Sequence, residues 1–192
     1  MQLAKWFALN TVTTFQSIVE TYALCDDEET LAQLHSLGVP AIKSPFSGLN
    51  ESVEFSLAWA RNNSASYAFI VHSDLPLLSH NTINELLHHT GSNIVVVPDR
   101  WEVGTNLLGI PYPMNFKVMF GHDSFREHSI TSFCDQAAEV FRSKTLGIDI
   151  DTIEDLYYVL KRYPRSEFSL FCHDILDHDT LSQIPIDNNI DV

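Results

Sequence analysis

The chain has 192 residues, of which 45% are hydrophobic, and a formal net charge of −14. This length fits one globular domain, and the hydrophobic fraction supplies a sizeable core, which excludes a disordered chain. The negative charge excludes a nucleic-acid backbone or an anionic membrane surface as the partner, because both would be repelled.

The chain has no apolar run that approaches the length of a membrane span. Its first residues, MQLAKWFALNTVTTF, have neither the cleavage site nor the continuous apolar stretch of a signal peptide. Cys25, Cys134 and Cys172 lie far apart and without C-x-x-C spacing, which indicates reduced thiols. We therefore expect a cytoplasmic monomer or homodimer that has neither a membrane nor a nucleic acid as its partner.

Helical and strand patterns alternate along the chain. The segment DDEETLAQLHSLG (26–38) has acidic residues in its first turn and a glycine at its end, which is typical of a helix. YAFIV (67–71) and NIVVVPD (93–99) are apolar runs typical of strands that are covered on both faces. In chain order we expect a helix at 1–14, a strand at 17–24, a helix at 26–38, a short strand at 39–43, a loop at 44–50, a helix at 51–63, a strand at 67–71, a helix at 80–89 and a strand at 93–99.

This alternation predicts a single α/β domain over 1–192, with a mainly parallel, Rossmann-like sheet flanked by helices. Residues 161–192 are expected to add a helical extension, SEFSLFCHDIL, and an acidic tail. Sheets of this kind bind ligands outside the carboxyl ends of their strands. Asp74, in SDLPLL, falls at such a place, directly after the strand predicted at 67–71.

A second group of carboxylates lies in LGIDIDTIEDLYYVL (146–160). Asp149 and Asp151 project to the same face if this segment is extended, and two adjacent carboxylates need a cation or a raised pKa. Mg²⁺ would satisfy both, and Asp74 could complete the set. The alternative is structural: Asp74 starts a turn, and Asp151 caps a helix with Glu154 as its capping partner.

Between these groups lie GTNLLGI (104–110) and FGHDSF (120–125), the second of which precedes a predicted helix, REHSITSFCDQAAEVF. Gly104 and Gly121 allow the backbone to approach a ligand closely, and Thr105 and Ser124 offer hydroxyls. A helix that begins near Ser124 would present N–H groups to an anion. The alternative is that Ser124 is only a helix cap and that Gly104 and Thr105 form a turn. The nine histidines have no metal-ligand spacing and are expected to be surface or packed residues.

The pieces GLN (48–50), SDLPLL, VVVPD, GTNLLG, FGHDSFREH and GIDIDTIEDL, in this order, resemble the CofC/FbiD guanylyltransferase family of coenzyme F₄₂₀ biosynthesis. The resemblance runs from about residue 17 to about 160. It implies an α/β fold of the nucleotide-diphospho-sugar transferase type, a GT-A-like nucleotidyltransferase. The implied activity joins GMP from GTP to the phosphate of 2-phospho-L-lactate, phosphoenolpyruvate or 3-phospho-D-glycerate and releases diphosphate.

The resemblance also implies roles for particular residues. The partners would be GTP and a small phospho-acid, and the cofactor would be Mg²⁺. Asp74, Asp149 and Asp151 would be catalytic and bind the metal, Thr105, Gly121 and Ser124 would bind the phospho-acid, and Gly48 and Asn50 would approach the nucleotide. Arg100, Trp101, Met114 and Lys117 are candidates for selecting the acid.

The sequence departs from the family at its start. Members begin with a strand and a basic loop that helps to hold the nucleotide, whereas this chain is expected to begin inside the first helix. Three explanations are open: a start codon assigned too late, a truncated homologue without catalysis, and a rearranged first segment. Two other functions stay open as well: a non-catalytic protein that binds a phospho-acid, and a nucleotidyltransferase with another acceptor, such as a sugar phosphate or molybdopterin.

Overall fold

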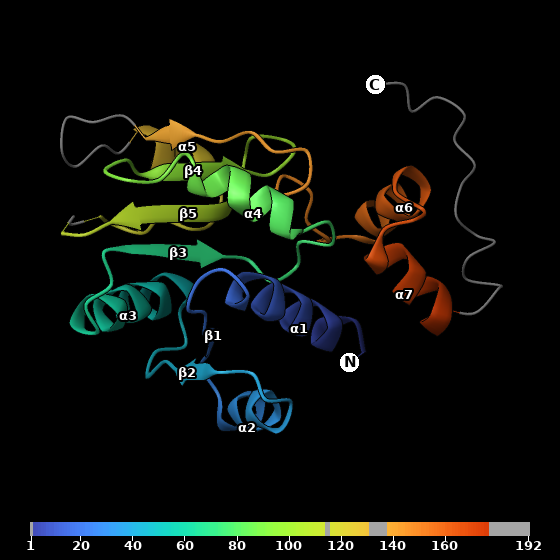
Figure 1. Ribbon diagram of the computed structural model, residues 1–192, viewed down its shortest axis with the longest axis horizontal. Coiled ribbons are helices and arrows are strands. Elements are labelled where there is room, and N and C mark those ends of the chain that lie inside the picture. Colours follow the sequence, from blue (N-terminus) through green and yellow to red (C-terminus); the bar gives the residue numbers. More distant parts are fainter. Residues whose placement is uncertain (1, 114–115, 131–137, 177–192) are drawn as a thin grey trace.

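The computed structural model describes residues 2–113, 116–130 and 138–176, and it shows a layered α/β architecture (Figure 1). Its larger sheet has four strands in the order β3-β5-β4-β6. The bounds of these strands are Tyr67–Val71 for β3, Thr105–Pro111 for β5, Val95–Pro98 for β4 and Glu139–Val140 for β6. A smaller parallel sheet pairs β1 (Ala23–Cys25) with β2 (Ala41–Lys43), and no strand pairing joins the two sheets within the described residues.

Seven helices surround the sheets in the described part of the chain. Their ends follow local signals: Asp27 caps α2 by accepting from the amide of Thr30, and Ser79 caps α4 in the same way through Thr82. The bounds are Gln2–Gln16 for α1, Glu28–Ser36 for α2, Leu49–Asn62 for α3, His80–Leu87 for α4, Ser124–Ile130 for α5, Ile153–Arg162 for α6 and Glu167–Ile175 for α7.

Three of the four strands of the larger sheet run in the same direction, as the sequence predicts. The exception is β5, which lies between β3 and β4 and is antiparallel to both. No strand was predicted here, and a turn at Gly104 and Thr105 was one of two open alternatives. Its interior contains Gly109, which weakens the strand pattern. Glycine is needed there because a Cβ would lie 2.6 Å from the hydroxyl of Tyr67 on the neighbouring strand.

Two further predictions are corrected. The strand expected at 17–24 is only β1, because the amides of Ser17 and Val19 still bond back to α1 at Thr13 and Phe15. Of the helix expected over 126–141, α5 covers the part up to Ile130, residues 131–137 lie outside the described residues, and Glu139–Val140 form the strand β6 instead. That strand forms because the amides of Glu139 and Phe141 bond to β4, so tertiary pairing overrides local helix propensity.

Apolar side chains cover both faces of the larger sheet. This explains why its strands are continuous apolar runs in which apolar and polar residues do not alternate. On one face Val95, Val97 and Leu107 pack against Ile83 and Leu86 of α4. On the other face the core contains Val96, Leu108 and Ile110 of the sheet with Val53 and Leu57 of α3. The carboxyl end of β3 is thereby held in a rigid layer.

The predicted C-terminal helix is α7, which packs with α6 beside α1 through Phe7, Val159 and Phe168 (Figure 1). The predicted tail from 177 on lies outside the described residues, as do Met114 and Cys134. Cys25 and Cys172 are free thiols, and burial raises the pKa of Cys172 to about 11. None of the described helices is long and apolar enough to cross a membrane.

Candidate active site

The three predicted catalytic aspartates come together at the carboxyl end of β3. Asp74 follows this strand by three positions, and its carbonyl oxygen accepts a hydrogen bond from the amide of Ile150 across 3.1 Å. Asp149 and Asp151 flank Ile150 in the chain. The backbone therefore fixes these two carboxylates beside a third that is far away in sequence.

Burial and like charges raise the pKa values of two of these carboxylates. Burial raises the pKa of Asp74, which the nearby His72 opposes and the charge of Asp151 reinforces. Burial, together with the charges of Asp151, Asp74 and Asp99, raises the pKa of Asp149 from 3.8 to about 6. The Oδ1 atom of Asp74 is buried without a hydrogen-bond partner among the described residues. An unpartnered carboxylate oxygen of this kind is costly unless a cation or a donor reaches it.

The donor set suits a hard divalent cation, because carboxylate oxygens are the ligands that Mg²⁺ prefers. Within the described residues, however, no three His, Cys, Asp or Glu side chains are close enough together to hold a metal ion. The chemistry of Asp74, Asp149 and Asp151 thus fits a cation that is also bound by substrate phosphates, as is usual for Mg²⁺.

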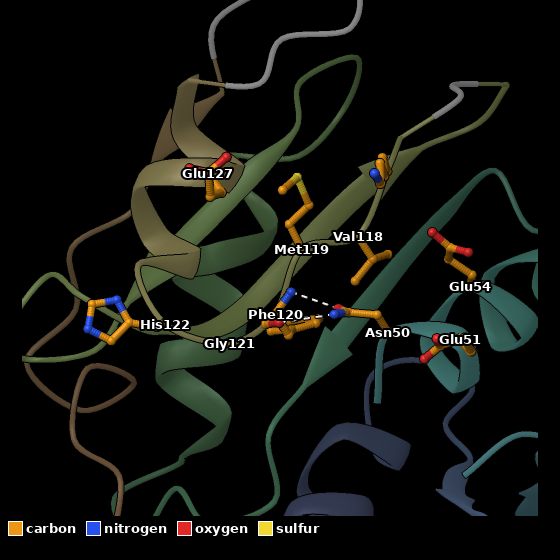
Figure 2. A pocket seen from close by; sticks show the side chains of 10 residues that line it. Asn50, Glu51, Glu54, Val118, Met119, Phe120, Gly121, His122 and Glu127 are labelled. Carbon is orange, nitrogen blue, oxygen red and sulfur yellow. Dashed lines mark hydrogen bonds between the residues drawn. The ribbon is translucent and has the colours of Figure 1, made fainter. Parts of the chain in front are cut away.

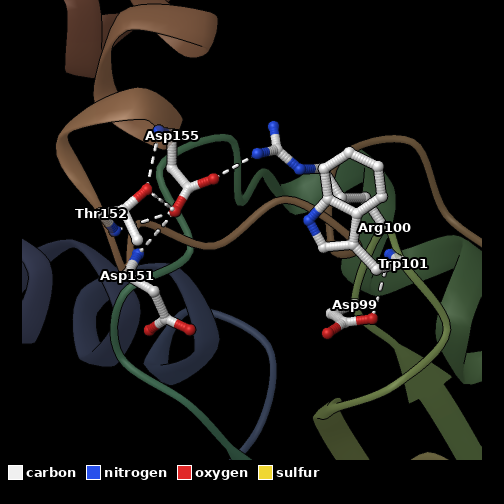
Figure 3. Close-up of polar contacts among 6 residues, drawn as sticks. All are labelled: Asp99, Arg100, Trp101, Asp151, Thr152 and Asp155. Atoms are coloured by element: carbon white, nitrogen blue, oxygen red, sulfur yellow. Dashed lines mark hydrogen bonds and ion pairs between the residues drawn. The ribbon is translucent and has the colours of Figure 1, made fainter.

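Asp151 does not cap the following helix, so the structural alternative for this residue is wrong. Thr152 is the N-cap of α6, and Asp155 completes the capping box by accepting from the amides of Asp151 and Thr152 (Figure 3). Asp155 also pairs with the guanidinium of Arg100. The carboxylate of Asp151 points away from these contacts, and the residue is exposed. The capping role therefore falls to its neighbours and leaves the Asp151 side chain available.

Asp99 has a different task, although it follows β4 as Asp74 follows β3. Its carboxylate accepts hydrogen bonds from the amides of Trp101, Val103 and Gly104 at 2.9 to 3.0 Å, and so folds the loop before β5. A Cβ at Gly104 would lie 2.9 Å from Asp99 Oδ2. The close approach predicted at Gly104 is thus made to this carboxylate, within the protein.

The three predicted phospho-acid residues lie on separate segments near one another. Thr105 is the first residue of β5, and Ser124 is the first residue of α5, as predicted. Gly121 lies three residues before α5. The amide of Ser124 donates to the carbonyl oxygen of Gly121 across 3.1 Å. Thr105 and Ser124 are buried, whereas residues 121–123 are exposed. A ligand would therefore approach this place at Gly121, whose φ of +132° requires glycine.

Two histidines that the sequence analysis left without a role lie among these groups. His128 bonds to Thr105 and to the amide of Met119. The His72 ring is 5.1 Å from that of Phe120 and affects the pKa values of both Asp74 and His128. Its Nε2 atom is buried without a partner among the described residues. His128 ends the piece FGHDSFREH, but its hydrogen-bond partners could not be predicted from the sequence, because they form only in the folded chain.

The predicted nucleotide residues lie at the start of α3, beside a cavity of about 450 Å³ (Figure 2). Gly48 is the N-cap of α3. The side chain of Asn50 makes two hydrogen bonds to the backbone of Phe120. Its Nδ2 donates to the Phe120 carbonyl oxygen across 3.0 Å, and its Oδ1 accepts from the Phe120 amide across 2.7 Å. The cavity joins Asn50 to Gly121 and is also lined by Lys117, one of the candidates for selecting the acid. Asn50 thus links the predicted nucleotide segment to the predicted phospho-acid segment.

Comparison with known proteins identifies a family. The family model described as "Guanylyl transferase CofC like" matches residues 2–162. A 2-phospho-L-lactate guanylyltransferase of Methanosarcina mazei is 38% identical over 53% of this chain and 51% of its own length. A phosphoenolpyruvate guanylyltransferase of Sphaerobacter thermophilus is 28% identical over 78% of this chain and 72% of its own. A 3-phospho-D-glycerate guanylyltransferase of Colwellia psychrerythraea is 27% identical over 57% and 53%. The matched region thus spans about half the length of most of these relatives.

A crystal structure from Desulfovibrio desulfuricans G20, assigned as a nucleotide-diphospho-sugar transferase, superposes with a TM-score of 0.74. It covers 97% of this chain and 86% of the other, at 13% sequence identity, so the likeness concerns the fold. The predicted fold class, an α/β domain of the nucleotide-diphospho-sugar transferase type, is thereby confirmed.

Proposed function

We propose a function for this chain on the basis that it belongs to the family of CofC-like guanylyl transferases. It would join GMP from GTP to the phosphate of a small phospho-acid and release diphosphate. The acid would be 2-phospho-L-lactate, phosphoenolpyruvate or 3-phospho-D-glycerate, as in the names of its relatives. The reaction would serve coenzyme F₄₂₀ biosynthesis in the cytoplasm.

The observation that carries this proposal is the junction of Asp74 with the segment of Asp149 and Asp151 through the Ile150 amide. These three residues would hold Mg²⁺. When bound, this ion neutralises phosphate charge and aligns the acceptor with the leaving diphosphate. Such a cation would also relieve the raised pKa of Asp149, because it favours the ionised carboxylate.

The remaining residues would position two anions against each other. Thr105, Gly121 and Ser124 would hold the phosphate of the acid, and Gly48 and Asn50 would lie against the nucleotide. Guanylyl transfer of this kind needs no covalent nucleophile, because positioning and electrostatic stabilisation carry it. The bond between Asn50 and Phe120 would keep the two substrate segments at a fixed separation.

The test is diphosphate release with GTP and Mg²⁺, measured separately with the three acids. Release with one acid, and its loss in EDTA, would support the proposal and identify the acceptor. Release with a sugar phosphate or molybdopterin in place of every acid would overturn it in favour of another nucleotidyltransferase.

A second candidate is a phospho-acid-binding protein without catalysis. It is favoured by the scarcity of cations for a triphosphate: before residue 60 the basic residues are Lys5 and Lys43, and Lys43 pairs with Glu28. This candidate predicts that calorimetry detects binding of an acid while no diphosphate is released with any of the three.

A further inference from the structure

We propose that His128 is a positioning residue for the phospho-acid. Its imidazole, as a single tautomer, holds together Thr105, the segment before Gly121 and the helix of Ser124. This inference rests on the proposed function. It gives a role to the last residue of the piece FGHDSFREH, which the predicted ligand contacts do not include.

His128 is enclosed by the protein. It lies on α5 with 1% of its surface exposed. The rings of Phe120 and Phe116 contact it, with centroids at 4.9 and 5.7 Å. A histidine placed in this way cannot rotate to change its partners without displacing both aromatic rings.

The hydrogen bonds fix which ring nitrogen carries the proton. A backbone amide can only donate, so the amide of Met119, 3.0 Å from Nε2, requires a lone pair on that nitrogen. The hydrogen of the neutral ring must therefore be on Nδ1, which lies 2.9 Å from Thr105 Oγ1 and donates to it. Burial and the charge of His72 lower the pKa of His128 to about 4, so the ring is neutral at pH 7.

The same assignment sets the direction of the Thr105 hydroxyl. Its oxygen accepts from the imidazole, so its own hydrogen must point elsewhere. No second partner of this hydroxyl occurs among the residues that the structure describes. The hydroxyl is thus oriented as a donor, which is the role that a phosphate oxygen requires.

One ring therefore connects the three segments that carry the predicted acid-binding residues. Nδ1 holds β5 at Thr105, and Nε2 holds Met119, two residues before Gly121. His128 itself lies one helical turn after Ser124. If the ring were lost, the segments would keep their own folds and the bond between Ser124 and Gly121, but Thr105 and Met119 would lose their shared partner.

Two variants separate the two bonds. In His128→Asn the amide nitrogen replaces Nδ1 and can donate to Thr105, whereas the bond to Met119 is lost. In His128→Gln the carbonyl oxygen replaces Nε2 and can accept from Met119, whereas the donor to Thr105 is lost. His173→Asn, at an exposed position on α7, is the matched control.

We expect both His128 variants to raise the KM for the phospho-acid by about tenfold, with the KM for GTP and kcat within about twofold. The KM effect should be larger for Gln, because it loses the bond to the residue that contacts the phosphate. The positioning role would be overturned if the KM for the acid and the KM for GTP changed equally. It would also be overturned if the melting temperature fell while the kinetic constants stayed unchanged.

A second measurement needs no activity. Nitrogen-15 spectra of the histidine rings should place the His128 hydrogen on Nδ1 at pH 7, and a hydrogen on Nε2 would overturn the inference. Calorimetry with phosphoenolpyruvate, 2-phospholactate and 3-phosphoglycerate then separates the two levels of the argument. If the wild type neither binds an acid nor releases diphosphate, the proposed function fails and the positioning role with it. If the wild type binds an acid and both variants bind it equally, only the inference fails.

Discussion

Arg100 and Asp155 form an ion pair that joins the loop after β4 to the first turn of α6 (Figure 3). Their side chains are 20% and 12% exposed, and the guanidinium also lies over the rings of Trp101 and Tyr158. The loop of Asp99 and the segment of Asp149 and Asp151 are thus held together. Arg100, one of the candidates for selecting the acid, is thus engaged in this ion pair, and both residues set the frame on which the carboxylates lie.

Replacement of Arg100 should destabilise the protein. Arg100→Met keeps the length of the side chain but leaves the carboxylate of Asp155 buried without its cation, so we expect the free energy of unfolding to fall by about 2–3 kcal/mol. Urea denaturation measures this loss. Arg142→Met is the control, because Arg142 pairs with Glu102 on the surface, and its denaturation midpoint should not change. Equal midpoints for the two variants would contradict the prediction.

Asp149→Asn should be more stable than the wild type at neutral pH, although it should be inactive. The pKa of Asp149 is raised in the folded state, so the wild type loses stability as the pH rises from about 4 through about 6. Asparagine removes this loss. Because Asp149 is only partly buried and solvent screens its charge, we expect a gain of about 1 kcal/mol at pH 7.5.

The measurement is urea denaturation of both proteins in EDTA at pH 4 and pH 7.5. Guanylyl transfer by the variant should fall by about two orders of magnitude or more, because a ligand of the cation is lost. Asp26→Asn, at an exposed position, is the control. If the stability of the wild type and of Asp149→Asn depends on pH in the same way, the pKa of Asp149 is not raised by burial and by the charges of Asp151, Asp74 and Asp99.

Asn50 should contribute to stability whether or not it touches the nucleotide. Asn50→Ala loses both bonds to the Phe120 backbone and should lower the free energy of unfolding by about 1–3 kcal/mol. Asn50→Asp keeps the acceptor for the Phe120 amide but places a carboxylate against the Phe120 carbonyl oxygen, so it should be no more stable than the wild type. Asn62→Ala, at the exposed end of α3, is the control. A higher KM for GTP with an unchanged melting temperature would assign Asn50 to the nucleotide alone.

Gly121→Ala tests the backbone at the predicted acid site. A Cβ there would meet no atom within 4 Å, so any cost comes from the φ of +132°. Gly38→Ala is the matched control, because it also has open space, with a φ of +73° that is near the left-handed helical region. We expect Gly121→Ala to lose about 1–3 kcal/mol and to bind the acid more weakly, and Gly38→Ala to lose less. The reverse order in urea denaturation would contradict this.

The sequence was sufficient where a pattern is local. The strands β3 and β4 were predicted from continuous apolar runs, and α2 from its acidic start and terminal glycine. The strand β5 was missed because Gly109, which fits under Tyr67, resembles a break in the pattern. The alternative cap of α6 lay one residue too early: Thr152 is the cap, through its reciprocal bonds with Asp155 in a Thr-x-x-Asp capping box.

The site was predictable to the same extent. Asp74, Asp149 and Asp151 stand in recognisable motifs. His128 ends the piece FGHDSFREH and His72 precedes SDLPLL, but neither could be given a role, because their contacts with Thr105, Met119 and Phe120 depend on the folded chain.

The separation of the two sheets has a consequence for local opening. The unit of β1, α2 and β2 has its own small core of Leu34 and Val39 and is joined to α1 through Val12. Its strands have three residues each, so few hydrogen bonds resist its detachment. Amide protons over 23–43 should therefore exchange through sub-global openings that leave the four-stranded sheet intact. The segment of Gly48 and Asn50 begins α3, which packs on the four-stranded sheet, so the predicted nucleotide residues lie just outside this less protected unit and should exchange more slowly than it does.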